Sequence, residues 1–196
     1  MTPRFSPLRP ALTAAMLLAG AAWAEAPAAP QPPEPETAPR NYVNLRVGVA
    51  TTSRQPVLCL EVAPLEFLSL SASGAGSEYR PASATASVSH YLVWLKLDSW
   101  KQKVGWLQPR VGLGFAEVQV GPDQGGFQFS GVGPEGVETA GPELSASMRL
   151  LVPTLGGFEL VGELSGTLAY FHHAPRLLHP RSRLEPGIGL TVGAGF

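Results

Sequence analysis

Apolar and polar residues alternate along most of the chain after position 40. The alternation is clearest at the C-terminus, where one set of positions is apolar and the intervening set is mostly glycine. The first set is Leu184, Pro186, Ile188, Leu190, Val192, Ala194 and Phe196, and the second is Arg183, Glu185, Gly187, Gly189, Thr191, Gly193 and Gly195. A helix would spread both sets around its circumference, whereas an extended strand separates them onto two faces. The pattern therefore predicts a β-strand.

Seven further segments show the same period of two. They cover residues 43–50, 58–62, 68–73, 90–97, 107–115, 143–152 and 158–168. With 183–196 they make a set of eight predicted strands. Roughly 19 residues are then available for each strand and its connection, which suits membrane strands of about 9–11 residues. A porin-sized barrel of about 16 strands would not fit into this length.

The polar faces of these segments are unusual for a soluble protein. They carry glycine, serine and isolated charges of both signs, whereas the solvent face of a soluble sheet usually carries lysine, glutamate and threonine. Glycine suits positions where space is scarce, such as the interior of a narrow barrel. A membrane barrel turns its apolar residues outward to lipid and its polar residues inward, and its closure satisfies every backbone group. We therefore predict an all-β fold, an eight-stranded antiparallel up-and-down transmembrane β-barrel.

The connections between the predicted strands alternate in length. The compact ones are 63–65, 98–103 and 153–157, and the longer ones are 74–84, 121–138 and 174–182. Short turns on the periplasmic side and longer loops outside are typical of outer-membrane barrels. An even number of strands then returns both termini to the periplasm. The first outer connection, 51–56, is short, so the sequence leaves the placement of the first hairpin open.

The residues before the predicted barrel have two distinct compositions. Arg4 and Arg9 precede a short apolar stretch, 11–22, and Ala22-Trp23-Ala24 has the small-x-small pattern of a signal-peptidase site. We predict a signal peptide over 1–24, with cleavage between Ala24 and Glu25. Residues 25–40 are rich in Pro and Ala, and such a segment is expected to be a disordered linker. The barrel is then assigned to 41–196.

Composition and charge exclude several classes of protein. The chain has 14 Lys and Arg against 15 Asp and Glu, and it has no basic cluster of the kind that neutralises phosphates, so we expect no nucleic-acid partner. The single cysteine, Cys59, excludes an internal disulfide framework and a cysteine-based zinc site. We read Cys59 as a small packing residue rather than a nucleophile.

The final segment carries a resemblance to a known family. Residues 187–196, Gly-Ile-Gly-Leu-Thr-Val-Gly-Ala-Gly-Phe, resemble the C-terminal signal of Gram-negative outer-membrane β-barrels. The segment 41–196 as a whole resembles a small eight-stranded barrel of the OmpA/OmpX type. The resemblance implies that the outer-membrane assembly machinery recognises this strand through Phe196, Ala194, Val192 and Leu190. It also implies an outer-membrane location and the lipid bilayer as a partner.

The predicted inward faces carry equal numbers of positive and negative residues. They are Arg46, Lys96, Arg110, Arg149 and Arg183, and Glu61, Glu143, Glu159, Glu163 and Glu185. Two functional interpretations are a selective pore and a carboxylate active site. The alternative is a lumen closed by paired charges, because an unpaired buried charge is costly and eight strands leave an interior just filled by side chains. We favour the closed lumen.

Three histidines near the C-terminus are the remaining candidates for chemistry. His172, His173 and His179 suggest a metal site or a catalytic base. His172 and His173 point to opposite faces of a strand, which is a poor arrangement for chelating one ion. We interpret them as polar residues of the outer rim, and we assign no catalytic, cofactor or metal residues.

Aromatic residues near the ends of the predicted strands suggest interfacial girdles. The periplasmic set is Tyr42, Trp100, Trp106, Phe158 and Phe196, and the outer set is Tyr79, Phe127, Tyr170 and Phe171. The sequence therefore predicts an outer-membrane barrel with a structural or surface-interaction role and no catalysis. One alternative is an outer-membrane enzyme that modifies lipid with rim histidines. Another is an exported lipocalin-like barrel that holds a ligand. The sequence does not identify an extracellular partner.

Overall fold

The computed structural model describes residues 38, 40–75, 86–121 and 126–196, without the side chains of Arg54 and Gln55. The chain divides into two units, Met1–Thr37 and Ala38–Phe196. The predicted signal peptide with its cleavage site, almost all of the predicted linker, and Tyr79 lie outside the described residues. All strands of the described residues lie in the second unit.

Nine strands and two short 3₁₀ turns make up this unit. The strands are β1 (Val43–Ala50), β2 (Ser53–Leu65), β3 (Leu68–Gly74), β4 (Ser87–Lys96), β5 (Trp100–Gln102), β6 (Gly105–Gln119), β7 (Glu138–Pro153), β8 (Glu159–Tyr170) and β9 (Leu184–Gly195). The turns are η3 (Leu155–Gly157) and η4 (Ala174–Arg176). Neither turn is long or apolar enough to cross a membrane, and the described residues contain no other helix.

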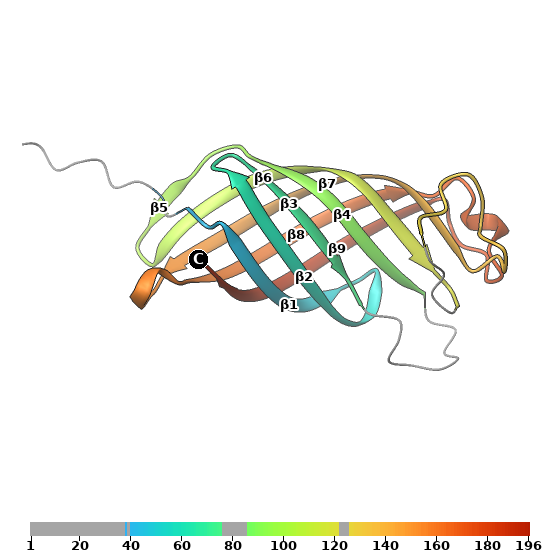
Figure 1. The fold of residues 1–196 in the computed structure, drawn as a ribbon, viewed down its shortest axis with the longest axis horizontal. Helices are drawn as coiled ribbons and strands as arrows, with labels where there is room; N and C mark the ends of the chain where they lie inside the picture. The colour runs from blue at the N-terminus through green and yellow to red at the C-terminus, as the bar shows by residue number, and fades with distance from the viewer. Residues whose placement is uncertain (1–37, 39, 76–85, 122–125) are drawn as a thin grey trace, which may run out of the picture. The chain divides into compact units, whose positions relative to one another are not determined.

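The sheet closes on itself into a barrel. Its strands follow the order β4-β3-β2-β1-β9-β8-β7-β6-β5, and β4 also pairs with β6. The three-residue β5 pairs with the beginning of β6, and β4 pairs with the rest of β6. Both lie on the same side of β6, so β5 continues the line of β4. Removing β5 from the nine strands leaves a ring of eight, and every pairing in it is antiparallel. Figure 1 shows this closed, up-and-down arrangement. The predicted all-β, eight-stranded antiparallel barrel is confirmed.

The strand boundaries differ from the sequence prediction mainly in the first hairpins. Strand β2 includes most of 51–56 and all of 63–65, which were predicted to be connections, and the real turns are Thr51–Thr52 and Glu66–Phe67. Each of the two segments contains a proline, Pro56 or Pro64, which is a residue that the interior of a strand usually excludes. Both prolines lie where the register of β2 shifts against a neighbouring strand, and a β-bulge tolerates proline inside a sheet.

The connections have different lengths at the two ends of the barrel. The terminus end carries the C-terminal residue Phe196 and the turns β2–β3, β4–β5–β6 and β7–β8. The loop end carries the turn β1–β2 and the connections β3–β4, β6–β7 and β8–β9, three of which are long. This agrees with the predicted alternation of connection lengths.

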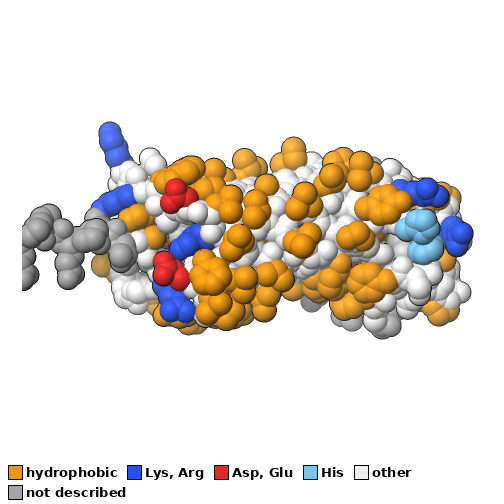
Figure 2. All heavy atoms as spheres, turned by 90° about the horizontal axis from the view of Figure 1, so that it is seen from above, with side chains coloured by type: hydrophobic (Ala, Val, Ile, Leu, Met, Phe, Trp, Pro, Cys, Tyr) orange, Lys and Arg blue, Asp and Glu red, His pale blue; other side chains and the backbone are white. Residues whose placement is uncertain are grey.

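The two faces of the barrel wall differ in polarity. Outward positions carry exposed apolar side chains on each of the eight strands of the ring. Among them are Leu45 and Val47 on β1, Leu58 and Leu60 on β2, Leu70 on β3, Val93 and Leu95 on β4, Val111 and Leu113 on β6, Leu144 and Met148 on β7, Leu160 and Leu164 on β8, and Leu190 and Val192 on β9. We call this set the apolar belt. Figure 2 shows apolar side chains along the wall and charged side chains gathered near the two ends. Inward positions are buried and largely polar in the middle of the barrel.

Candidate functional site: the charge network in the lumen

Five charged side chains from five different strands meet inside the barrel. They are Arg46 on β1, Glu61 on β2, Arg110 on β6, Arg149 on β7 and Glu163 on β8. We call this group the charge network. Each of these residues occupies an inward position of its strand, and each is at most 5% exposed. All five belong to the ten charged residues that the sequence assigned to the lumen.

Each carboxylate of the charge network is contacted by all three guanidinium groups. Glu61 accepts hydrogen bonds at 2.9 Å from Nη2 of Arg46, at 2.9 Å from Nη2 of Arg110 and at 2.8 Å from Nη1 of Arg149. Glu163 lies 2.5 Å from Nη1 of Arg46, and it accepts hydrogen bonds from Nη1 of Arg110 at 2.8 Å and from Nε of Arg149 at 2.7 Å. A buried charge is tolerated when it is paired and hydrogen-bonded in this way.

Polar and aromatic neighbours hold Arg110 in place. Its Nη2 donates to Oγ of Ser69 at 2.6 Å, and its guanidinium lies 4.7 Å from the ring centre of Trp94. Trp94 in turn donates from Nε1 to Oγ of Ser71 at 2.8 Å. Stacking a guanidinium on an indole adds a cation–π attraction that strengthens when water is excluded.

Glycine at position 112 makes room for Trp94. The two residues face each other across the β4–β6 pairing. A Cβ on Gly112 would lie 2.8 Å from Cε3 of the indole ring. The inward glycine therefore lets the ring lie against the wall, and it acts on the charge network through Trp94.

Cys59 contacts the charge network as well. Nη2 of Arg46 donates to its Sγ at 3.0 Å, and the thiol is buried. The inward position of Cys59 agrees with the packing role assigned from the sequence. Its hydrogen bond to Arg46 was not expected.

A second polar cluster lies nearer the loop end, around Glu143. His90 on β4 approaches both carboxylate oxygens of Glu143 through Nδ1, at 3.0 and 2.9 Å, and Oγ of Ser145 donates to Oε1 at 2.9 Å. Sequence analysis included Glu143 but missed His90 as its partner. The signal was present, because His90 shares strand parity with Lys96, which the same analysis placed inward.

The five other predicted lumen charges lie outside the charge network. Glu143 is part of the cluster just described. At the terminus end, Glu159 accepts a hydrogen bond from Nδ2 of Asn41 at 2.6 Å, and Asn44 donates to Asn41 at 2.7 Å. Lys96 lies 3.4 Å from the exposed Glu66.

Arg183 and Glu185 lie at the loop end. Arg183 is exposed, and Glu185 pairs with Arg181 at 2.7 Å. The assumption that alternation alone puts a charge in the lumen therefore failed beside the long loops. Strand β9 begins only at Leu184, so Arg183 lies before the strand and is not enclosed by the barrel wall.

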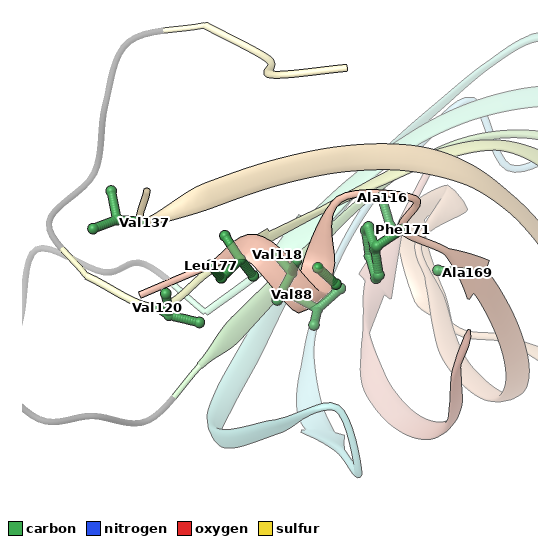
Figure 3. Close-up of a cluster of buried hydrophobic side chains, with 9 residues drawn as sticks. Val88, Ala116, Val118, Val120, Val137, Ala169, Phe171 and Leu177 are labelled. Carbon is green, nitrogen blue, oxygen red and sulfur yellow. The ribbon is translucent and has the colours of Figure 1, made fainter. Parts of the chain in front are cut away.

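Apolar side chains close the lumen on both sides of the polar middle. At the loop end, a cluster is formed by Val88, Ala116, Val118, Val120, Val137, Ala169, Phe171, Ala174 and Leu177. Figure 3 shows the side chains of this cluster near the ends of the strands. Trp106, Leu151 and Val161 pack together in a smaller cluster nearer the terminus end.

A small cavity remains between the two apolar clusters. It measures about 50 Å³, and its lining includes Arg46, Cys59, His90 and Glu163. A single water needs roughly 10–15 Å³ of such volume, so the cavity has room for a few water molecules and no larger ligand.

Most of the aromatic residues predicted for the two ends of the barrel are exposed on its outer wall. At the terminus end Tyr42, Trp100, Phe158 and Phe196 are exposed, and the Phe158 and Phe196 rings meet edge to face with centres 6.3 Å apart. Trp106 is buried in the lumen instead, because it occupies an inward position on β6.

Asp98 anchors one of these exposed rings. The backbone N–H of Ser99 donates to the Asp98 carboxylate at 2.7 Å and Nε1 of Trp100 donates at 2.6 Å, and these bonds lower the pKa of Asp98. The turn thus fixes the Trp100 ring at the terminus end.

At the loop end, the partly exposed Tyr91 and Phe115 and the exposed Phe127 and Phe129 form an aromatic patch on the outer wall. The Phe115 ring stacks on Tyr91 with centres 4.9 Å apart, and it meets Phe127 and Phe129 edge to face at 4.8 and 5.2 Å. Tyr170 is also exposed there, as predicted. Phe171 is not, because it points inward and belongs to the apolar cluster at the loop end.

The three histidines lie on the β8–β9 connection, so the expectation that His172 and His173 point to opposite faces of a strand was wrong, because β8 already ends at Tyr170. The rings of His172 and His173 meet edge to face with centres 4.7 Å apart. Partial desolvation and the nearby His172, Arg176 and Arg183 lower the pKa of His173. Within the described ranges, no three His, Cys, Asp or Glu residues are grouped so that they could hold a metal ion.

The predicted assembly strand forms one of the seams of the barrel. Leu190, Val192 and Phe196 are exposed on its outward face, where Ala194 also lies. The backbone of Phe196 exchanges hydrogen bonds with Val43, which ties β9 to β1.

No protein-family model, curated protein or solved structure matches the chain. Its function is therefore inferred from this geometry.

Proposed function

We propose that this chain is an integral outer-membrane β-barrel protein of the OmpA/OmpX-like kind, with a structural or surface-interaction role in the Gram-negative cell envelope. The observation that carries the proposal is the inverted polarity of the barrel. Charged residues such as Glu61 and Arg149 are buried inside, while leucine and valine side chains of the apolar belt are exposed outside. A soluble barrel would gain from the opposite arrangement, because apolar surface in water costs about 25 cal/mol per Å². Lipid reverses that balance.

The chain-end features extend this proposal to location and assembly. A cleaved signal peptide over 1–24 would deliver the chain to the envelope, and the assembly machinery would recognise the final strand. The outward apolar residues of β9 and the Phe196 ring face away from the lumen, so another protein has access to them. This exposure supports recognition of the final strand. The exposed aromatic residues at both ends fit the two interfaces of a bilayer.

The proposed barrel is plugged rather than porous. The charge network crosses the middle of the lumen, and apolar clusters lie on both sides of it. The cavity in the middle of the lumen, at about 50 Å³, is far below the roughly 300–1,000 Å³ of ordinary ligand pockets. The larger hollows, of about 350 and 380 Å³, are more open and are not lined by the charge network. The small size of the lumen cavity argues against a lipocalin-like carrier.

The proposed role is also non-catalytic. His90 and Glu143 form a histidine–carboxylate pair of the type that general-base catalysis uses. The position of this pair supports a non-catalytic role. Both residues are buried between the charge network and the apolar cluster at the loop end. A lipid or polymer substrate has no room to reach them there.

Fractionation of cells that express the full chain tests the proposal. We expect the protein to stay with outer membranes after extraction with sodium carbonate at high pH. We also expect unheated samples to migrate differently from boiled samples on a detergent gel, because a closed barrel resists unfolding by detergent. Release of the protein into the soluble periplasmic fraction would refute the proposal. An unchanged lipid profile in a deletion strain is expected, and a specific loss of one lipid modification would favour the enzymatic alternative.

A further inference from the structure

The β8–β9 loop (residues 171–183), which we call the basic loop, is a rigid and strongly basic segment at the loop end. Three of the four histidines of the chain lie in it, together with three arginines. The six residues are His172, His173, Arg176, His179, Arg181 and Arg183. None of them belongs to the charge network, and none of them is needed to close the barrel.

The basic loop is held in one conformation by its own apolar residues. Phe171, Ala174 and Leu177 are buried in the apolar cluster at the loop end. The backbone N–H of Leu178 donates to the carbonyl of Gly136 at 2.7 Å, and that of Phe171 donates to Arg183 at 2.7 Å. A loop fixed in this way presents its charged side chains without a large cost in ordering entropy upon binding.

The positive charge of the basic loop is only partly compensated. Arg181 pairs with Glu185 at 2.7 Å. Within the described part of the chain, Arg176 and Arg183 have no ion-pair partner, and both side chains are exposed. Desolvation lowers the pKa of His173, and the positive potential of His172, Arg176 and Arg183 lowers it further.

The basic loop borders directly on the apolar belt. Tyr170 and Leu184 are paired across β8 and β9 at the last step before the loop, and both are exposed on the outer wall. Leu178, within the loop, is exposed as well. Figure 2 shows histidine and Lys or Arg side chains at one end of the barrel, beside apolar side chains of the wall.

We propose that the basic loop binds the phosphate group of a membrane lipid whose acyl chains lie against the adjoining apolar belt. Arg176 and Arg183 supply fixed charges and fork-shaped donors that match phosphate oxygens. Tyr170 and Leu184 offer apolar surface at the level where the acyl chains begin. A soluble anion would use only the charges, whereas a lipid uses both surfaces. The inference rests on the proposed membrane location, and it names the partner at this rim.

Lipid retention by the full-length protein tests the inference. The protein, purified in a neutral detergent, is mixed with dioleoyl phosphatidic acid, phosphatidylglycerol or phosphatidylcholine, and bound lipids are counted by native mass spectrometry. We expect both anionic lipids to be retained in preference to phosphatidylcholine. In the double variant Arg176→Gln/Arg183→Gln, their affinity should fall by roughly 10- to 30-fold, since each basic residue near a membrane surface contributes about 1 kcal/mol. Both changed side chains are exposed, so the barrel should fold normally.

The charge-matched control is Lys101→Gln/Lys103→Gln, which removes two exposed cations from the opposite end of the barrel. This control should retain anionic lipids as the unaltered protein does. Equal losses in both double variants would overturn the inference, and so would an undiminished preference in the arginine variant. If inorganic phosphate at the same concentration bound to the protein as tightly as the anionic lipids, the assignment of a lipid as the partner would be overturned. If dextran sulfate bound more tightly than any lipid, the inference would be wrong and the partner would be an acidic polymer.

Failure of the inference can be separated from failure of the proposed function. The same protein is first incorporated into vesicles of phosphatidylcholine alone, in which the basic loop has no anionic lipid to bind. A protein that inserts there but shows no preference for phosphate-bearing anionic lipids refutes only the inference. A protein that does not insert refutes the membrane proposal on which the inference rests.

Discussion

Glu61 and Arg149 connect opposite walls of the barrel. They belong to β2 and β7, which are separated by four steps in either direction around the ring of eight strands. Nη1 of Arg149 nevertheless donates to Oε1 of Glu61 at 2.8 Å, and Nη2 contacts Oε2 of the same carboxylate. The ion pair therefore spans the lumen and ties together strands that share no backbone hydrogen bonds.

Removing one partner of this pair should strongly destabilise the barrel. Arg149→Ala leaves Glu61 and Glu163 with one fewer buried counter-charge, and breaking a buried pair in this way costs about 3–5 kcal/mol. Thermal unfolding in detergent, followed by circular dichroism, should show a much larger loss for this variant than for the outward Leu190→Val. Equal losses in the two variants would mean that the lumen is hydrated and that the charges are screened by water.

A double-mutant cycle separates the ion pair from general disruption. In Glu61→Gln/Arg149→Gln, the loss of stability should be smaller than the sum of the two single losses, because each single change leaves a charge without its counterpart. Additive losses would contradict direct coupling across the lumen.

Gly112 should be intolerant of even a methyl group. In Gly112→Ala the new Cβ would collide with the Trp94 ring, which must then move away from Arg110 and Ser71. Overpacking of this kind costs about 1–3 kcal/mol, and the near-ultraviolet circular dichroism of the buried indole should change. Gly166→Ala is the matched control, because an added Cβ there meets nothing within 4 Å. A similar effect at both sites would show that glycine acts through backbone freedom and not through the space it leaves.

The sequence predicts the barrel better than it predicts the lumen. Alternation along β8 and β9 correctly separates Leu164 and Leu190 from Glu163 and Thr191, because a strand alternates wherever its two faces meet different surroundings. The same rule assigned Arg183 to the lumen, where it fails because the strand has not yet begun.

Strand register and barrel curvature decide which inward charges meet. Neither can be predicted from the pattern of a single sequence. Glu61 and Arg149 are 88 residues apart, and no local pattern links them. His90 was missed as the partner of Glu143 for a different reason. It lies on an inward face that also carries apolar residues such as Leu92, so the polarity of that face did not single out His90.

The intact barrel should not conduct ions. The charge network fills its middle and Phe171 lies in the apolar cluster that covers it at the loop end, while an eight-stranded barrel is only about wide enough for its own side chains. Purified protein in planar lipid bilayers should give no steady single-channel current at any applied voltage. Stable, ion-selective conductance would require abandoning the plugged lumen.

Phe196 should matter for assembly more than for stability. Phe196→Asp puts a charge at the outward end of β9, which is the proposed recognition strand, and the amount of folded protein in the outer membrane should fall several-fold. Phe129→Asp removes another exposed aromatic residue, at the opposite end of the barrel, and should assemble normally. Normal levels of folded Phe196→Asp protein would show that the final residue is not read during assembly.

The central claim, that the apolar belt faces lipid, is tested most directly by spin labels on the outer wall. In a Cys59→Ser background, single cysteines at Leu113, Leu164 and Leu190 sample the belt on three strands, and Leu178 samples the basic loop. After reconstitution into lipid vesicles, the belt labels should collide readily with oxygen, which concentrates in the bilayer, and hardly at all with a water-soluble nickel chelate. The label at Leu178 should be the more accessible to nickel. Belt labels that relax with the nickel chelate as strongly as the Leu178 label would place the wall in water and contradict the account.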